Sequence, residues 1–371
     1  MPKYKIIQVL TDTNIGGAGI YLLNYLKARS EDEFETAVIL PRGAELIPFV
    51  QKTGARVIEA DHIADCSYSR EATQTLCAIF REEKPDLVHT HASLSARIAA
   101  KKCKIPVVNT RHCLEEPKRF PKNIAYRFLN NTLSDRVIAV SKAVEQNLLR
   151  DGISARKLRM IYNGIPPQPH YSDAERAALR KQFGFGEDGI YIGIVARLEP
   201  VKNHDLFLDA AAECLRADPT LTFVIAGSGT REDELKKKAS AISDRILFLG
   251  QVEEVSRLFC ALDIAVLTSV HEALSLSLLE AMAQGRAVVS TRSGGPEEFV
   301  VPNENGFLCD HTAKSLSEAL LSLSADEALR QRLGENGKRT AERFTASEMA
   351  HKIEEVYRES VSHNAAKSGK E

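Results

Sequence analysis

The 371-residue sequence has almost no net charge, no closely paired cysteines and no long apolar segment. With 49 Lys and Arg against 50 Asp and Glu, the formal charge is −1, which argues against a dedicated nucleic-acid-binding protein, since these are usually clearly basic. The seven cysteines form no C-x-x-C pair, a pattern that favours reduced thiols and a cytoplasmic location. No apolar run approaches the ~18 residues that a membrane span requires, and the lysine-containing start, Met1–Leu10, is not typical of a signal peptide.

The near-zero charge is the sum of two opposite halves. Residues 1–168 carry 25 basic and 18 acidic side chains, a balance of +7, whereas residues 169–371 carry 24 and 32, a balance of −8. The segment from Arg97 to Arg136 alone contains ten basic and three acidic residues. Because opposite charge attracts different ligands, we expect the two halves to have different partners.

Short apolar runs alternate with helix-like segments, which predicts parallel sheets covered by helices on both faces. The alternation stops at Asn163–Pro169, where three prolines within four positions predict an interdomain hinge, and then restarts. The prediction is an α/β protein with two doubly wound, Rossmann-like domains that face each other across a cleft, at which the strand carboxyl ends bind ligands. The predicted boundaries are 1–165 for the N-terminal domain, 166–345 for the C-terminal domain, 346–362 for a helix packing back toward the N-terminal domain, and 363–371 for a disordered tail.

Two loops that follow predicted strands contain residues suited to an anionic ligand. Gly16 and Gly17 precede a helix, where glycine lets a ligand approach the backbone and the free N–H groups attract an anion. Arg197 and Lys202 follow the first strand of the second domain, where two cations could bind a diphosphate. Taken alone, each loop fits a tight turn or a solvated surface equally well.

A third loop runs from His271 to Glu280 and joins a predicted strand to a helix. A carboxylate at Glu280 could accept hydrogen bonds from a ribose diol, and the opening amides around Ser275 and Leu276 could face phosphate. Glu272 would then lie nearer a sugar. Two glutamates at this spacing are also common on ordinary surfaces.

Three histidines, His89, His91 and His112, occur at strand ends in the first domain. Alternate residues of a strand share a face, so His89 and His91 could converge on a metal. No Cys or carboxylate completes a ligand set, and we therefore expect no metal. The sequence also lacks a G-x-G-x-x-G fingerprint, a P-loop and a G-x-S-x-G motif.

The order of the motifs along the chain is more specific than any one of them. They are Gly16-Gly17-Ala18, Tyr162-Asn163-Gly164-Ile165, Ala196-Arg197-Leu198 with Lys202, an E-x7-E pair from Glu272 to Glu280, and Ser293-Gly294-Gly295-Pro296-Glu297-Glu298. Over nearly its whole length the sequence thus resembles the GT-B fold glycosyltransferases of the large retaining family four, which includes many bacterial cell-envelope and exopolysaccharide sugar transferases.

The resemblance implies a role for each matching residue. The implied catalytic residues are His112 near the reacting sugar, Glu272 on the sugar hydroxyls, and Arg197 and Lys202 on the diphosphate. The implied donor-binding residues are Gly16, Gly17, Asn163, Arg197, Lys202, Leu274, Ser275, Leu276 and Glu280. The family needs no metal or other cofactor, in agreement with the absence of a D-x-D pair, because fixed cations and helix dipoles replace it.

The implied reaction is the transfer of a hexose from a nucleotide-diphosphate sugar, a UDP-sugar more commonly than a GDP-sugar, to an unidentified acceptor hydroxyl. Cell-envelope polysaccharide or glycolipid synthesis is the expected setting. A sugar-nucleotide epimerase and a catalytically silent GT-B scaffold are the alternatives. Ala273-Leu274-Ser275 departs from the Gly-Phe-Gly often found in the family, which leaves the donor sugar open, and Arg286 replaces a frequent proline.

The basic segment also predicts a membrane-facing or acceptor-facing surface. Its cations Lys118, Arg119, Lys122 and Arg127 alternate with the aromatic residues Phe120, Tyr126 and Phe128. Such a mixture suits an anionic membrane, at about 1 kcal/mol per nearby cation, and predicts a peripheral position on the inner face of the cell membrane. The alternative is a solvated helix whose aromatic side chains face the core.

Overall fold

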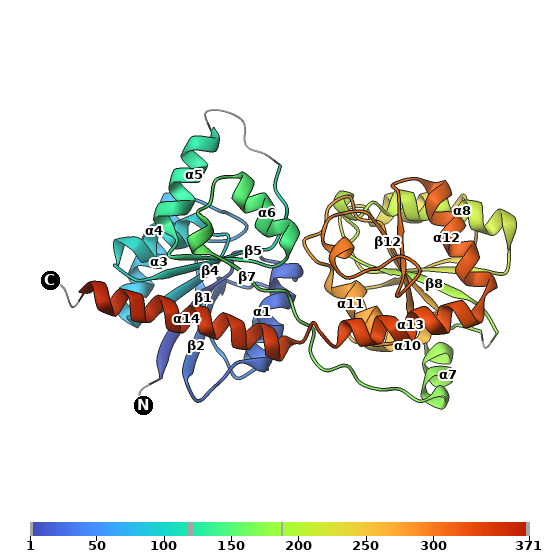
Figure 1. Ribbon diagram of the computed structural model, residues 1–371, viewed down its shortest axis with the longest axis horizontal. Coiled ribbons are helices and arrows are strands. Elements are labelled where there is room, and N and C mark those ends of the chain that lie inside the picture. Colours follow the sequence, from blue (N-terminus) through green and yellow to red (C-terminus); the bar gives the residue numbers. More distant parts are fainter. Residues whose placement is uncertain (1–2, 117–121, 187, 369–371) are drawn as a thin grey trace. The chain divides into compact units, whose positions relative to one another are not determined.

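The computed structural model describes residues 3–116, 122–186 and 188–368, and its chain folds into two compact units (Figure 1). Unit 1 comprises Met1–Pro166 and Thr345–Glu371, and unit 2 comprises Pro167–Phe344. The division falls inside the proline-rich segment. Over the described residues each unit is a parallel sheet with alternating helices, so the predicted pair of doubly wound, Rossmann-like domains is confirmed.

Unit 1 contains, within the described residues, a seven-stranded parallel sheet in the order β3-β2-β1-β4-β5-β6-β7. Its strands are β1 (Tyr4–Val9), β2 (Phe34–Pro41), β3 (Arg56–Ala60), β4 (Leu87–His91), β5 (Val107–Arg111), β6 (Arg136–Ala139) and β7 (Leu158–Met160). Its helices are α1 (Gly17–Ala28), α2 (Ile47–Gln51), α3 (Arg70–Glu83), α4 (Leu94–Lys102), α5 (Lys122–Leu133), α6 (Lys142–Arg150), η1 (Ala155–Lys157) and α14 (Ala346–Ser368). The strand order reverses between β1 and β4, and ligands of such sheets bind at the carboxyl ends beside this switch point.

The β1 strand shows why the sequence forms a central strand. Ile6, Ile7 and Val9 are fully buried, as expected for a parallel strand that helices cover on both faces. Gln8 interrupts this apolar run and is also fully buried. A buried amide in a central strand needs polar partners; the Gln8 side-chain oxygen finds one in His91 on β4, whereas its nitrogen has no hydrogen-bond partner among the described residues.

The C-terminal helix α14 packs on unit 1, against α1, β4 and β5 (red in Figure 1). Arg358 and Glu33 form a two-bonded ion pair at 2.8 Å and 2.8 Å, and the Glu354 carboxylate accepts a hydrogen bond of 2.7 Å from the Ser30 N–H. The helix continues to Ser368, so the prediction of a disordered tail from residue 363 is wrong for residues 363–368. The stretch has two alanines and no Gly or Pro before Gly369, a composition that favours helix; residues 369–371 lie outside the described residues.

Unit 2 repeats the same order in a sheet that has six parallel strands over the described residues, β10-β9-β8-β11-β12-β13. Its strands are β8 (Tyr191–Val195), β9 (Thr222–Ala226), β10 (Ile246–Gly250), β11 (Ile264–Leu267), β12 (Ala287–Thr291) and β13 (Phe307–Cys309). Its helices are α7 (Asp173–Gln182), η2 (Pro200–Lys202), α8 (His204–Ala217), α9 (Glu232–Ser240), α10 (Val255–Ala261), α11 (Leu276–Ala283), η3 (Gly295–Glu298), α12 (Ala313–Ala325) and α13 (Glu327–Ala341). The switch point of this sheet lies between β8 and β11.

A charged network fixes the opposite, amino-terminal edge of the unit 2 sheet. Asp263 directly precedes β11 and pairs with Arg176 at 2.7 Å and with Arg180 at 2.6 Å. Arg286 directly precedes β12 and donates to the backbone carbonyls of Gln284 and Leu262. Burial lowers the pKa of Arg286 to about 10. Arg286 therefore belongs to the edge of the sheet that lies away from the predicted site.

Candidate active site

The predicted cations of unit 2 lie in loops that flank its switch point. The loop after β8 carries Arg197 and Lys202, and the loop after β11 leads to Glu272. Two hydrogen bonds join the loops, from the Val270 N–H to the Val201 carbonyl at 2.9 Å and from the Thr268 hydroxyl to the Lys202 carbonyl at 2.8 Å. The structure thus holds together two segments that are about 70 residues apart in sequence.

Lys202 and Glu272 form an ion pair at the centre of this arrangement. Their side chains are 21% and 11% exposed, and the Ser269 hydroxyl donates a second hydrogen bond of 2.8 Å to the same oxygen of Glu272. The backbone of Glu272 is bonded on both sides, to the Ser293 carbonyl at 2.8 Å and from the Gly295 N–H at 2.9 Å. Glu272 is therefore a fixed carboxylate with a fixed cation beside it.

Arg197 differs from Lys202 because its side chain forms no hydrogen bond and no close ion pair among the described residues. Its side chain is also exposed. Its neighbour Glu199 accepts hydrogen bonds from the N–H and hydroxyl of Thr230, at 3.1 Å and 2.9 Å, and these lower the pKa of Glu199. Since Glu199 is occupied by Thr230, Arg197 remains a cation available to a ligand.

The start of α11 combines an unusual backbone with open amides. Ser275 has a φ of +80°, in a region that L-residues other than glycine rarely adopt, at a position where the family often has glycine. Its hydroxyl accepts a long hydrogen bond of 3.4 Å from the Leu278 N–H. Leu276 opens the helix, so its N–H has no acceptor within the helix. Leu274 is only 1% exposed, so its backbone alone can contribute to binding, and Glu280 is partly exposed on α11.

Helix α1 of unit 1, beside the switch point of its sheet, lacks a side-chain cap at its N-terminus. The helices α3, α4 and α6 begin with Ser69, Ser93 and Ser141, and each serine caps its helix through its hydroxyl. Helix α1 begins instead with Gly16, which provides no side-chain cap, and with the exposed Gly17. The first amides of α1 are therefore accessible to a ligand.

The remaining predicted donor residue of unit 1 is Asn163. It is buried, and its side-chain oxygen has no hydrogen-bond partner among the described residues. It precedes Gly164, whose carbonyl accepts a hydrogen bond of 2.9 Å from the side-chain amide of Asn24. Gly16, Gly17, Asn163 and His112 thus belong to unit 1, whereas Arg197, Lys202, Glu272, Leu274, Ser275, Leu276 and Glu280 belong to unit 2.

His112 lies in a cluster of histidines at the carboxyl ends of β1, β4 and β5. His91 Nδ1 and His112 Nε2 are 2.8 Å apart, and His91 Nε2 lies 2.9 Å from Gln8 Oε1. The ring of Tyr21, from α1, packs edge-on against both His91 and His112, with centroids 5.7 Å and 4.7 Å away. Sequence reasoning missed Gln8, although a lone amide within an apolar strand was a usable signal.

His89 belongs to the same cluster but has separate partners. Its two ring nitrogens lie 2.6 Å from the Tyr357 hydroxyl and 2.7 Å from the Thr110 hydroxyl. Burial lowers the pKa of His89, of His112 and of His91, the last to about 3. The cluster is thus neutral at physiological pH, and no group of His, Cys, Asp or Glu within the described residues has an arrangement that would hold a metal ion.

The predicted membrane surface maps in part to α5. Lys118, Arg119 and Phe120 lie outside the described residues, as does the side chain of Lys122. The aromatic residues that are described divide: Tyr126 hydrogen-bonds with Arg111 at 2.8 Å and Glu115 at 3.2 Å, whereas Phe128 is 66% exposed. The residues that join Phe128 on the exposed face are Arg127, Ile124 (59% exposed) and Leu129 (36% exposed). Neither apolar residue was predicted, although the i, i+4 spacing of Ile124 and Phe128 was a usable signal.

No helix in the described part of the chain has both the length and the apolar composition of a membrane span.

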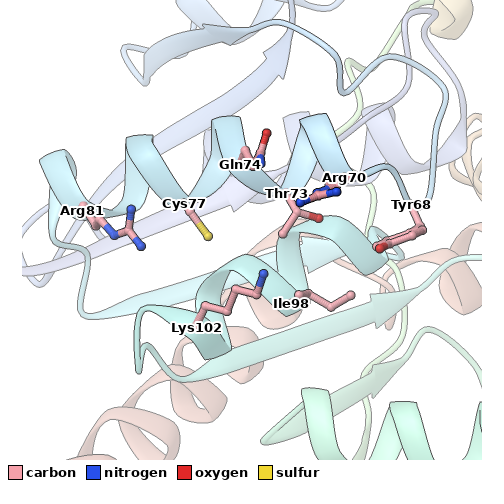
Figure 2. A pocket seen from close by; sticks show the side chains of 8 residues that line it. All are labelled: Tyr68, Arg70, Thr73, Gln74, Cys77, Arg81, Ile98 and Lys102. Carbon is pink, nitrogen blue, oxygen red and sulfur yellow. The ribbon is translucent and has the colours of Figure 1, made fainter.

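A groove of about 300 Å³ lies between α3 and α4 of unit 1 (Figure 2). It is lined by Tyr68, Arg70, Thr73, Gln74, Cys77, Arg81, Ile98 and Lys102. None of the predicted site residues lines this groove.

Comparisons with protein families match both units. Residues 15–168 match Glycosyltransferase Family 4, and residues 175–340 match Glycosyl transferases group 1. Together the two matches include the Gly16–Gly17 loop, His112 and every predicted residue of unit 2.

Individual relatives are distant but extensive in coverage. A D-inositol 3-phosphate glycosyltransferase of Streptomyces bingchenggensis is 26% identical, over 93% of this chain and 85% of its own length. An Escherichia coli UDP-Gal:alpha-D-GlcNAc-diphosphoundecaprenol alpha-1,3-galactosyltransferase is 27% identical, over 69% of this chain and 70% of its own. The crystal structure of HepE from Anabaena, in complex with UDP and glucose, has the same fold, with a TM-score of 0.85, 23% identity, and coverage of 95% of this chain and 99% of HepE.

Proposed function

Because this chain belongs to family 4 of the GT-B glycosyltransferases, it is a glycosyltransferase, and we propose that it moves a hexose from a UDP-sugar to an acceptor hydroxyl with retention of anomeric configuration. One observation carries the proposal: the exposed Arg197, whose side chain makes no hydrogen bond or close ion pair within the described residues, lies in the same loop as Lys202, which pairs with Glu272. The names of the E. coli galactosyltransferase and of the HepE complex favour UDP over GDP as the carrier.

The proposed roles follow from the state of each side chain. Arg197 binds the diphosphate, since a guanidinium can donate two parallel hydrogen bonds to it. Lys202 adds a second positive charge, and Glu272, held by Lys202 and Ser269, accepts hydrogen bonds from sugar hydroxyls. Glu280 binds the ribose, and the first amides of α11 face phosphate.

Charge stabilisation is the main task of these groups during transfer. The bond between the anomeric carbon and the phosphate oxygen breaks, and the acceptor oxygen bonds to the same face of that carbon. The proton of the acceptor hydroxyl passes to the leaving phosphate oxygen. Negative charge grows on the diphosphate as it leaves, and fixed cations stabilise this charge more in the transition state than in the ground state.

We also propose that transfer needs no metal ion, because Arg197 and Lys202 supply the positive charge. Addition of EDTA to the purified protein should then leave turnover unchanged. A loss of activity that Mg²⁺ or Mn²⁺ restores would contradict this part of the proposal.

The function is tested by incubating the protein with UDP-glucose, UDP-galactose, UDP-N-acetylglucosamine and GDP-mannose, each with and without candidate acceptors. Calorimetry with UDP and GDP measures binding in parallel. We expect UDP to bind, and one UDP-sugar to release UDP with an α-linked product. A new nucleotide sugar formed without acceptor would indicate an epimerase, and no binding of any nucleotide would indicate a silent protein.

For the acceptor we propose a lipid-linked or cell-envelope saccharide, reached from the inner face of the cell membrane. The support is the exposed Ile124, Phe128 and Leu129 beside Arg127 on α5, because apolar side chains next to cations suit an anionic lipid surface. The diphosphoundecaprenol in the name of the E. coli relative agrees with such an acceptor.

Sedimentation with vesicles tests this surface. Binding to phosphatidylglycerol-containing vesicles should fall at least about 10-fold in Phe128→Asp, since Phe burial contributes roughly 1.5–3 kcal/mol. Leu149→Asp is the matched control, because Leu149 is also exposed, at 43%, but lies on α6. Equal binding of wild type and Phe128→Asp, or equal binding to neutral vesicles, would contradict the membrane proposal.

A further inference from the structure

The histidine cluster of unit 1 contains a hydrogen-bonded chain that ends at the implied catalytic histidine. It runs from Gln8 Oε1 to His91 Nε2 at 2.9 Å, and from His91 Nδ1 to His112 Nε2 at 2.8 Å. The remaining nitrogen, His112 Nδ1, is buried and has no hydrogen-bond partner among the described residues. An unpaired nitrogen at the carboxyl edge of a sheet is a site for a ligand group.

The position of each proton in this hydrogen-bonded chain follows from Gln8, its first member. A carboxamide oxygen only accepts hydrogen bonds, so His91 Nε2 carries a proton. A neutral imidazole has one N–H, so His91 Nδ1 is an acceptor and His112 Nε2 must donate to it. In a neutral His112 the second nitrogen, Nδ1, then carries a lone pair and no proton.

The surroundings keep both rings neutral. His91 is 4% exposed, and burial lowers the pKa of the His91 imidazole and of the His112 imidazole. The groups that face His112 are His91 from β4, Tyr21 from α1 and Arg111 from β5. They include no carboxylate, so none of them favours a protonated His112.

We propose that Gln8 and His91 are positioning residues that hold His112 as the tautomer with an unprotonated Nδ1, so that Nδ1 accepts a hydrogen bond from a substrate hydroxyl. The inference rests on the proposed function and adds to it two residues and the direction of one hydrogen bond. A sugar hydroxyl is a suitable donor for this lone pair. An ammonium or a hydroxyl would be accepted, whereas a phosphate oxygen or carbonyl would be rejected.

The tautomer can be measured without any substrate. In protein labelled with ¹⁵N-histidine, two-bond ¹H–¹⁵N correlation spectra distinguish protonated from unprotonated ring nitrogens, and His112→Ala identifies the signals of His112. We expect an unprotonated Nδ1 and a protonated Nε2 on His112 at pH 7. In Gln8→Leu this single pattern should be lost. A protonated Nδ1 on His112 in the wild type would overturn the proposal.

Kinetics test whether the tautomer matters. Gln8→Leu should lower kcat by about 10-fold or more, as the loss of an orienting partner does, with little change in UDP affinity, since unit 2 supplies the diphosphate site. In a His112→Ala background, Gln8→Leu should have no further effect on kcat, because it acts through His112. An equal loss in both backgrounds would show a merely structural role.

Thr110→Val is the matched control. Thr110 is buried in the same cluster, but its hydroxyl bonds to His89 rather than to the chain that leads to His112. This variant should lose stability and keep the His112 tautomer and kcat. A loss of kcat in Thr110→Val as large as in Gln8→Leu would count against the proposal.

Two further outcomes separate the sources of the hydroxyl and the two proposals. If Gln8→Leu slows acceptor-independent hydrolysis of the UDP-sugar, the hydroxyl belongs to the donor, and if it slows only transfer, it belongs to the acceptor. If the wild type neither hydrolyses nor transfers any nucleotide sugar, the proposed function fails, while the spectra still decide whether Gln8 and His91 set the tautomer.

Discussion

The two units share one strand order but have opposite chemistry at their carboxyl edges. In unit 1 this edge holds buried, neutral rings, with Gln8, His91 and His112 hydrogen-bonded in series. In unit 2 the same edge holds charged side chains. Lys202 forms an ion pair with Glu272, and the exposed Arg197 side chain makes no hydrogen bond or close ion pair among the described residues. Since the sheets share one strand order, the side chains at the strand ends and in the loops, and not the order of the strands, set the chemistry of each edge.

Acidification should break this comparison most strongly. Burial lowers the pKa of three histidines in unit 1, His89, His91 and His112, and lowers that of His204 in unit 2 to about 4. Below pH 6.5 the unfolded chain therefore binds more protons, and stability falls as the pH falls. With its pKa at about 3, His91 alone accounts for about 2 kcal/mol between pH 6.5 and 5. Glu354, whose pKa burial raises, offsets part of the loss in unit 1.

Unit 1 should thus unfold before unit 2 at pH 5. Denaturant-dependent hydrogen exchange followed by mass spectrometry measures the two units separately, after correction for intrinsic exchange rates. Unfolding of unit 2 first, or an equal loss in both units, would contradict the assignment of buried neutral histidines to unit 1.

Lys202→Ala removes a fixed charge from the charged edge and leaves Glu272 without its ion-pair partner. We expect kcat for sugar transfer to fall by at least about 100-fold, as when one donor to a developing oxyanion is lost. Lys236→Ala is the control, because Lys236 pairs with Glu232 on the exposed α9 helix. Steady-state kinetics of UDP release measure both variants, and near-wild-type kcat in a folded Lys202→Ala protein would remove Lys202 from the mechanism.

A pair of glycine substitutions tests how each edge uses its glycines. A Cβ at Gly295 would lie 2.3 Å from the Ala273 carbonyl oxygen, whereas a Cβ at Gly17 would meet nothing within 4 Å. Gly295→Ala should therefore lower the unfolding free energy of unit 2 by about 1–3 kcal/mol, while Gly17→Ala leaves that of unit 1 unchanged. Chemical denaturation checks both, and a loss of UDP-sugar affinity in the stable Gly17→Ala would show that a ligand approaches the backbone there.

The smallest expected effect comes from Ser275. Its φ of +80° costs a non-glycine residue roughly 1–2 kcal/mol, and the capping hydrogen bond that its hydroxyl accepts from the Leu278 N–H is long, at 3.4 Å. Ser275→Gly should raise the unfolding free energy of unit 2 by about 0.5–1 kcal/mol. Ser172→Gly, at a helix cap with an ordinary φ of −71°, should lower it by about a few tenths. Opposite signs in the two denaturation curves are the expected result, and equal signs would contradict the strain at Ser275.

The fold could be predicted well from the sequence, because the hydrophobic periodicity of each element and the turn residues between elements are local features of the chain. The alternation of strands and helices and the prolines near Pro166 need no knowledge of distant contacts. The alternating pattern that is readable in the sequence does not include β7, β13, α6 and α7, which are short or flank the domain boundary. Helix α7 was within reach, since Ser172 and Glu175 form a capping box, a pattern that is readable from sequence.

The residues of the candidate site could be proposed from the sequence, but their hydrogen-bond and ion-pair partners could not. Arg197 and Lys202 looked equivalent in sequence, yet only Lys202 meets a carboxylate, because the loop after β11 brings Glu272 to it. His89 and His91 alternate along one strand, yet their rings bond to different partners, His89 to Tyr357 and Thr110 and His91 to Gln8 and His112. Such pairings depend on strand order and register, which no local pattern encodes.

The return of α14 to unit 1 reverses the order in which the two units are completed during synthesis. Unit 2 is one continuous segment, Pro167–Phe344, whereas unit 1 needs residues from Thr345 onward. On the ribosome, the Tyr357 hydroxyl that bonds to His89 is added only after all of unit 2 exists. The part of unit 1 that α14 covers therefore stays exposed until α14 has been synthesised.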